Sequence, residues 1–116
     1  MARTFALPAA LLLMAATPPV THETFDVPQD KGPQQVIVQS RTFDPGASSG
    51  WHVHPGVEMA TVLSGTVELV TAGGVRRLGP GESFLMPRGA AHNGFNPGSE
   101  PARVMITLVI DKGADL

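Results

Sequence analysis

From residue 35 onward, short apolar runs alternate with residues that form turns. The intervening positions hold combinations such as Asp-Pro-Gly, Ser-Gly and Asn-Pro-Gly, and no stretch after residue 20 has a helical period. Short strands at close spacing between Gly- and Pro-rich turns are typical of sandwiches and barrels. The pattern therefore predicts an all-β fold with strands at residues 35–43, 50–54, 58–63, 66–71, 75–78, 83–86, 91–95 and 103–110.

Two of these runs make further predictions. Gly73 and Gly74 suit the two central positions of a hairpin turn, because both tolerate a positive φ. The last run, residues 103–110, is apolar at both odd and even positions. A strand with one solvent-facing side would alternate with polar residues. Either both of its faces are buried within the monomer, or one face meets a partner, and we therefore expect a homodimer.

The first 16 residues differ from the rest of the chain. Arg3 precedes an almost wholly apolar stretch from residue 5 to residue 16, which is too short to span a membrane. A basic start, an apolar centre and the small residues Ala15 and Ala16 are typical of a secretory signal peptide. We expect a leader at 1–16 and a periplasmic or secreted protein. An ordinary N-terminal strand or helix is the alternative.

Proline and the apolar pattern set the remaining boundaries. Prolines at 18, 19, 28 and 33 predict an extended linker over residues 17–35, followed by one domain at 36–111 and a tail at 112–116. A chain of 116 residues allows one domain of ordinary size. The net charge is −2, and there is no run of Lys or Arg, so no nucleic-acid partner is expected. The absence of cysteine excludes disulfides and thiolate metal sites.

Three of the four histidines form a pattern with one glutamate. His52 and His54 are two residues apart, which places both imidazoles on one face of a strand. Glu58 follows the bend at Pro55-Gly56, and His92 follows a later turn. Taken singly, each has an ordinary explanation: a surface pair, a solvated carboxylate, a turn residue. Together, three imidazoles and a carboxylate make a nitrogen and oxygen site suited to a divalent first-row metal.

The spacing of these residues within a glycine frame resembles the two motifs of the cupin family. The first motif contains Gly46, His52, His54, Glu58 and Gly65, and the second contains Gly81, Pro87, Gly89, His92 and Asn96. The resemblance covers residues 36–110. It implies a conical antiparallel double-sheet barrel of the jelly-roll type. It also implies that His52, His54, Glu58 and His92 surround one metal ion inside the barrel.

The other motif residues have structural roles in this interpretation. The four glycines stand where strands must reverse, and glycine permits a positive φ there. Asn96 is expected to form a turn and to bond nearby backbone, without being a metal ligand. Trp51, Met59, Phe84, Met86 and Phe95 lie near the motifs in sequence, and most of them are expected in the ordinary core. Arg41 and Arg88 either anchor an acidic ligand or lie exposed on the surface.

The residues leave the metal and the reaction open. Four-coordinate zinc would give a closed site, whereas iron, manganese, nickel or cobalt would keep positions for substrate. Glu58 is the candidate catalytic residue, as a proton relay. The resemblance to quercetinase-type cupins favours a dioxygenase-like oxidoreductase that acts on a small oxygen-bearing molecule. Two alternatives stay open: an isomerase or decarboxylase that needs no oxygen, and a non-enzymatic periplasmic module that binds a metal or small ligand.

Overall fold

The computed structural model describes residues 2–6 and 32–116, and these contain strands and turns with no helix. The all-β prediction is therefore confirmed. Residues 1 and 7–16 of the predicted leader and residues 17–31 of the predicted linker lie outside the described residues. The strands are β1 (Gln34–Phe43), β2 (Gly56–Ser64), β3 (Val67–Thr71), β4 (Gly74–Leu78), β5 (Ser83–Met86), β6 (His92–Phe95) and β7 (Ala102–Asp111).

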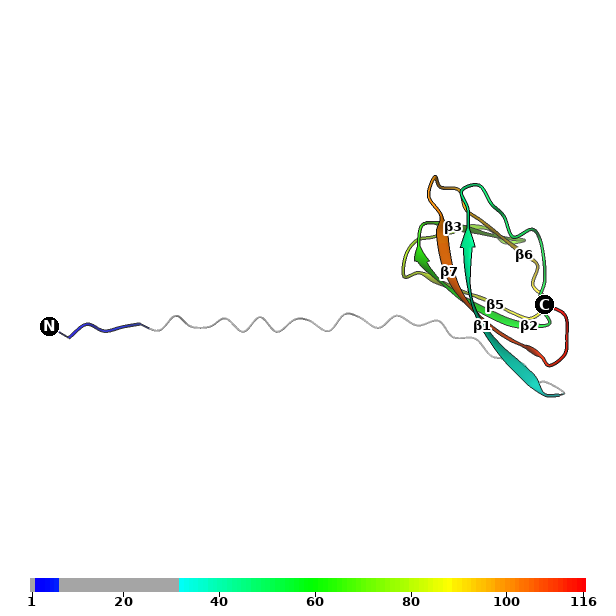
Figure 1. Ribbon diagram of the computed structural model, residues 1–116, viewed down its shortest axis with the longest axis horizontal. Coiled ribbons are helices and arrows are strands. Elements are labelled where there is room, and N and C mark those ends of the chain that lie inside the picture. The colour runs from blue at the N-terminus through cyan, green and yellow to red at the C-terminus, as the bar shows by residue number, and fades with distance from the viewer. Residues whose placement is uncertain (1, 7–31) are drawn as a thin grey trace.

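The strands form two antiparallel sheets that together make the jelly-roll barrel. The larger sheet has the order β1-β7-β2-β5, and the smaller has the order β4-β3-β6. The long strands β1 and β7 pair over ten positions, from Gln34 opposite Asp111 to Phe43 opposite Ala102, and run side by side in Figure 1. No helix in the described ranges is long and apolar enough to cross a membrane.

Strand β7 shows where the core lies. Val104, Ile106, Leu108 and Ile110 are at most 6% exposed and point between the sheets, whereas Met105 on the other face is 37% exposed. Burial of a Leu or Ile side chain contributes about 1.5–3 kcal/mol, so this strand is a major source of stability. The strand that is apolar on both sides thus buries one face within the monomer and turns the other outward.

The predicted strand at residues 50–54 is not formed. This segment instead runs beside β6 and bonds to it only at isolated points, through the bridges Ser48–Phe95 and His52–His92. Gly50 has a φ of 77°, a left-handed conformation that interrupts an extended run. The short run between turn residues predicted a strand here, but the left-handed conformation of Gly50 interrupts the extended backbone.

The predicted hairpin is present with its turn shifted by one residue. Thr71 pairs with Gly74, so the two-residue loop consists of Ala72 and Gly73. The four motif glycines all have the expected positive φ, between 72° and 83°. Gly65 also lacks space for a side chain, because a Cβ there would lie 2.7 Å from the carbonyl oxygen of Pro101.

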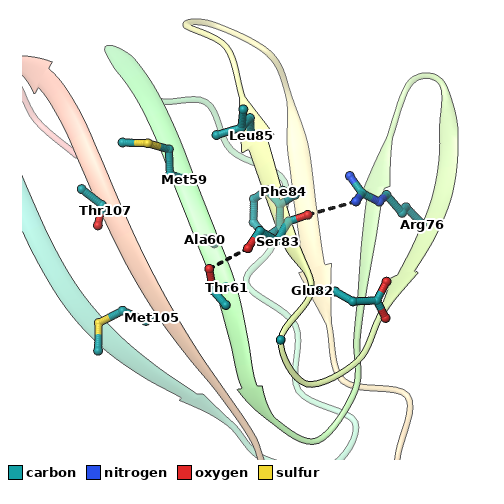
Figure 2. A pocket seen from close by; sticks show the side chains of 11 residues that line it. Met59, Ala60, Thr61, Arg76, Glu82, Ser83, Phe84, Leu85, Met105 and Thr107 are labelled. Atoms are coloured by element: carbon teal, nitrogen blue, oxygen red, sulfur yellow. Dashed lines mark hydrogen bonds between the residues drawn. The ribbon is translucent and has the colours of Figure 1, made fainter. Parts of the chain in front are cut away.

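The outer face of the larger sheet is hollowed. Figure 2 shows this outer groove, which has a volume of about 630 Å³. Its walls include the thioethers of Met59 and Met105 and the side chain of Leu85. The Thr61 and Ser83 hydroxyls bond to each other at 2.7 Å, and the Arg76 guanidinium donates to the Ser83 carbonyl at 2.9 Å.

Candidate metal centre

Three parts of the fold bring the predicted residues together. His52 and His54 come from the segment between β1 and β2, Glu58 from β2 in the larger sheet, and His92 from the start of β6 in the smaller sheet. Each offers one ligand atom, and these atoms all lie within 4.8 Å of one another. The structure thus places all four predicted side chains in one cluster, where the two sheets meet.

Backbone hydrogen bonds hold the His52–His54 segment against the other motif. The amides of His52 and His92 each donate to the other's carbonyl at 3.0 Å. The Gly89 amide, in the turn before His92, donates to the His54 carbonyl at 3.2 Å. These bonds fix the spacing of the two motifs, although the segment is not part of either sheet.

Arg88 fastens the same turn to the end of β7. Its guanidinium donates to both carboxylate oxygens of Asp111, at 2.8 and 2.9 Å, and to the Pro55 carbonyl at 2.9 Å. The hydrogen bond from Arg88 lowers the pKa of Asp111 below its ordinary value. Arg88 is therefore engaged with the turn between His54 and Glu58, and it does not line the cavity beside the cluster.

Glu58 stands at the centre of the cluster. Its Oε2 lies 3.0 Å from His54 Nε2 and 2.8 Å from His92 Nε2. Glu58 is 5% exposed and His92 is 2% exposed. The ring centroids of His52 and His92 are 4.2 Å apart. A buried carboxylate among three imidazoles is stable only if a proton or a metal ion offsets its charge.

The backbone orients two of the rings. His52 Nδ1 lies 2.8 Å from the Gly50 carbonyl, and His92 Nδ1 lies 2.9 Å from the Ala90 carbonyl. Because a carbonyl can only accept, each Nδ1 must carry the hydrogen. In the neutral ring the lone pair is then on Nε2, the arrangement that backbone partners give to metal-bound histidines. His54 Nδ1 is buried, with no hydrogen-bond partner among the described residues.

The cluster shifts the pKa values of its members in different directions. Burial alone would raise the pKa of Glu58, but the hydrogen bond from His92 and the charges of the three histidines outweigh it, so this pKa lies below its ordinary value. Burial would lower the pKa of His92, yet the hydrogen bond to Glu58 and the Ala90 carbonyl raise it. For His54, burial outweighs the attraction of Glu58 and lowers the pKa. Without a metal ion, a proton shared between Glu58 and His92 is the favoured state.

The donor set fits a divalent metal ion. Glu58 remains ionised and His54 remains neutral at neutral pH, as ligands must be. A proton shared between His92 and Glu58 would be displaced when a metal ion binds. Imidazole and carboxylate donors suit zinc, iron, manganese, nickel and cobalt alike, so the donor set allows each of these ions.

A small inner cavity of about 30 Å³ adjoins the cluster. Of the five side chains named from the motifs, only Phe84 lines it. Trp51 is 59% exposed, and Met59 faces the outer groove. The other walls are the cluster residues His52, Glu58 and His92 with Arg41, Phe43, Ser49, Val67, Leu69, Gly94, Val104 and Ile106.

Sequence reasoning missed Phe43 and Ser49 as lining residues. The alternation of a strand could have found Phe43, because it is two residues after Arg41 and therefore on the same face. The Ser49 hydroxyl accepts a hydrogen bond from the Gly94 amide at 2.8 Å, and no local sequence pattern indicates this tertiary contact. Asn96 has the expected structural role, since its fully buried amide donates to the carbonyls of Phe43 and Glu100.

Comparison with known proteins decides the family. The cupin domain model matches residues 40–110. This chain belongs to the cupin family. No curated protein gives a significant match to this cupin.

Three solved structures illustrate the likeness. A cupin domain protein from Bordetella pertussis Tohama I is 27% identical, covering 74% of this chain and 91% of its own, with a TM-score of 0.57. An oxalate oxidase bound to the substrate analogue glycolate is 28% identical, with a TM-score of 0.58 and 63% of this chain covered. A sugar phosphate isomerase from Silicibacter pomeroyi DSS-3 is 25% identical, with a TM-score of 0.61 and 66% of this chain covered. This cupin spans only 41% of the oxidase chain and 52% of the isomerase chain.

Proposed function

We propose that this cupin binds one divalent transition-metal ion through His52, His54, Glu58 and His92, and that it is a metal-dependent enzyme of the dioxygenase type. The observation that carries the proposal is the convergence of four ligand atoms within 4.8 Å, with Glu58 and His92 buried. The similarity to an oxalate oxidase supports oxidative chemistry on a small oxygen-bearing molecule.

The metal ion would supply Lewis-acid polarisation of a substrate oxygen. The chain's own residues would do the rest. The Gly50 and Ala90 carbonyls hold the imidazoles of His52 and His92 in orientation. Glu58 would hold and pass a proton at Oε2, which already lies 2.8 Å from His92 Nε2. The apolar walls at Phe84 and Ile106 exclude water beyond the volume that the cavity admits.

The size of the cavity favours a small substrate. A cavity of about 30 Å³ favours a small reacting group, so the reacting end of the substrate would enter and the remainder would lie toward the opening. Small hydroxy and oxo acids and diketones match this description better than a flavonol, whose fused rings exceed the enclosed space. The substrate class follows from the walls as well as from the metal donors.

The test begins with the metal content of the protein purified from its native compartment. Elemental analysis identifies the ion, and oxygen uptake is then followed with small hydroxy acids, oxo acids, diketones and catechols. We expect uptake that requires the ion and is lost in Glu58→Gln. Turnover under anaerobic conditions would instead indicate an isomerase or decarboxylase. Tight metal binding without any turnover would indicate a binding module.

The outer face of the larger sheet supports a homodimer. Val36 and Val38 are 63% and 64% exposed, and their register beside Val109 and Thr107 places them on the same face as the outer groove. We propose that this face meets the same face of a second copy, as in an interface with two-fold symmetry. Light scattering should give twice the chain mass, and Val38→Glu should give a monomer. A monomeric wild-type protein would contradict the dimer.

Export is proposed from the N-terminal sequence alone. A leader that ends near Ala16 would deliver the protein to the periplasm or the medium. N-terminal sequencing of the mature protein tests this directly. A start near Thr17 supports export, and a retained Met1 or Ala2 in a cytoplasmic fraction contradicts it.

A further inference from the structure

Arg41 brings a positive charge to the inner face of the larger sheet. It pairs with Val104, which is 2% exposed and points into the core. Directly opposed residues in an antiparallel pair share a face of the sheet, so Arg41 also faces inward. Its guanidinium carbon lies 4.6 Å from the centroid of the Phe43 ring, and both residues line the cavity that His52, Glu58 and His92 line.

Within residues 32–116, no carboxylate forms an ion pair with the Arg41 guanidinium. Glu58 is the sole acidic residue among those that line the cavity, and its Oε2 already faces His54 and His92. Among the described residues, the one ring, ion-pair or hydrogen-bond interaction of the Arg41 side chain is with the Phe43 ring. A guanidinium stacked on a ring keeps its planar fork of donors available, which matches the geometry of a carboxylate.

Metal binding would make the cavity more positive. Arg41 is exposed but lines the cavity, and a bound divalent cation, ionised Glu58 and Arg41 would sum to two positive charges around that cavity, whereas the whole chain has a net charge of −2. A local excess of positive charge attracts anions. The complementary ligand is therefore an anion, and a neutral sugar or a cationic amine would leave this charge unpaired.

The strand register places Arg41 some distance from the metal donors. Glu58 lies opposite Leu108 and Arg41 lies opposite Val104, four residues further along β7. At about 3.4 Å per residue, the two backbone positions are about 13 Å apart along the strand, and the two long side chains cover part of that distance. An acid group at Arg41 is thus distinct from the oxygen that reaches the cluster.

We propose that Arg41 determines specificity for small organic acids, by binding an anionic group of the ligand while an oxygen at its other end faces His52, Glu58 and His92. This proposal rests on the proposed metal function and names its substrate class. A molecule with one carboxylate and no second oxygen group can reach one end of the cavity only, so it should gain little from Arg41. A dicarboxylate can reach both.

Calorimetric titration of the metal-loaded protein tests the proposal without relying on turnover. The probes are succinate and glutarate, with acetate as the short comparison. We expect Arg41→Gln to weaken dicarboxylate binding by about 10- to 100-fold, as for a lost hydrogen bond to a charged group. Acetate binding should change by less than about twofold, and Arg41→Lys should retain part of the affinity, because it keeps the charge and loses the fork.

Arg103→Gln is the matched control. Arg103 pairs with Thr42, one position away from the pair of Arg41, and it is exposed on the outer face. The Arg103→Gln substitution removes one positive charge outside the cavity, so it should leave the affinity for dicarboxylates unchanged. Equal dicarboxylate affinity of Arg41→Gln and wild-type proteins, both shown by elemental analysis to carry metal, would overturn the role of Arg41. Failure of the proposed function appears separately, as a wild-type protein that takes up no metal.

Discussion

The inner cavity and the outer groove lie on opposite faces of one four-stranded sheet, and they differ in size and in chemistry. The groove is about 630 Å³ and the cavity about 30 Å³. The groove has the hydroxyls of Thr61 and Ser83, which bond to each other, and the thioethers of Met59 and Met105. The cavity is lined by His52, Glu58 and His92, whose ligand atoms lie with that of His54 within 4.8 Å of one another. Convergence of donors, and not volume, therefore marks the candidate site in this fold.

The alternation of strands produces this contrast. Along β2, the buried residues Glu58 and Ala60 lie opposite Leu108 and Ile106 and face inward, while the side chains of Met59 and Thr61 face the groove. A change of a single position moves a side chain from one environment to the other. Neighbouring residues on one strand thus serve as matched pairs in experiments that separate the two regions.

The largest effect is expected from loss of a cluster ligand. Four-ligand zinc sites contribute about 10–16 kcal/mol, so one ligand is worth about 2.5–4 kcal/mol and its loss should weaken metal binding by about 70- to 1,000-fold. We expect this for Glu58→Gln and His92→Ala in titrations with a competing chelator. Glu68→Gln is the control, because Glu68 pairs with the exposed Arg77 on the smaller sheet. Wild-type metal affinity in both cluster variants would contradict the proposed metal site.

The two faces of β7 should also differ in their contribution to stability. Leu108 is 1% exposed on the inner face, and Leu108→Ala should lower the free energy of unfolding by about 3 kcal/mol. Met105 is 37% exposed on the outer face, and Met105→Ala should lower it by less than about 1 kcal/mol. Urea unfolding at fixed protein concentration measures both. Equal losses would mean that the outer face is as tightly packed as the core.

Acid should weaken metal binding through His92. The pKa of His92 is raised, so its proton must be displaced as pH falls below that value, and affinity should fall by about tenfold per pH unit. The lowered pKa of Glu58 keeps that carboxylate ionised throughout this range, and the lowered pKa of His54 means that it binds a proton less readily than His92. Titrations between pH 5.5 and 8.5 in buffers of different ionisation enthalpy would show protons released on metal binding. A flat profile would contradict the shared-proton state.

Stability of the metal-free protein should change in the opposite sense. A raised pKa of His92 in the folded state adds stability that is fully present below the unfolded value of about 6.5 and is lost as pH rises through the folded value. The lowered pKa of Glu58 adds stability that is lost only under acid conditions, as pH falls through that folded pKa. Thermal melts with and without metal should therefore diverge as pH rises from 6 to 8.

The smallest effect is expected at the Arg88–Asp111 pair. Both side chains are partly exposed, at 33% and 49%, and exposed ion pairs contribute little to stability. Asp111→Asn should leave the urea midpoint of unfolding nearly unchanged. It should weaken metal binding by a few-fold, within the range for outer partners. A loss as large as that of Glu58→Gln would show that the Pro55 turn depends wholly on this pair.

Much of the barrel could be predicted from the sequence. Residues 83–86 and 103–110 were placed within about a residue of β5 and β7, because apolar runs end sharply at glycine and proline. Residues 50–54 could not be assigned correctly, since alternation is the same in a strand and in a segment bonded at isolated points. The turn at residues 72–73 differs by one position, because Gly74 takes its positive φ while pairing with Thr71.

The cluster could be predicted from spacing, but its surroundings could not. The intervals between His52, His54, Glu58 and His92 pointed to one centre, and the structure places them together. Arg41 and Arg88 were equivalent in the sequence as possible anchors. Only the register of β1 against Val104 turns Arg41 inward, and only Asp111 at the end of β7 engages Arg88. Both are long-range contacts that no local pattern contains.

The cluster draws its donors from both halves of the barrel, with Glu58 on one sheet and His92 on the other. A metal ion coordinated by both residues would cross-link the two sheets. Opening of the sandwich would then break coordination bonds as well as apolar contacts, and amide protons along β2 and β6 would exchange with deuterium more slowly in the loaded protein. Loss of the metal ion would therefore weaken the contact between the two sheets at the same site where it would abolish activity.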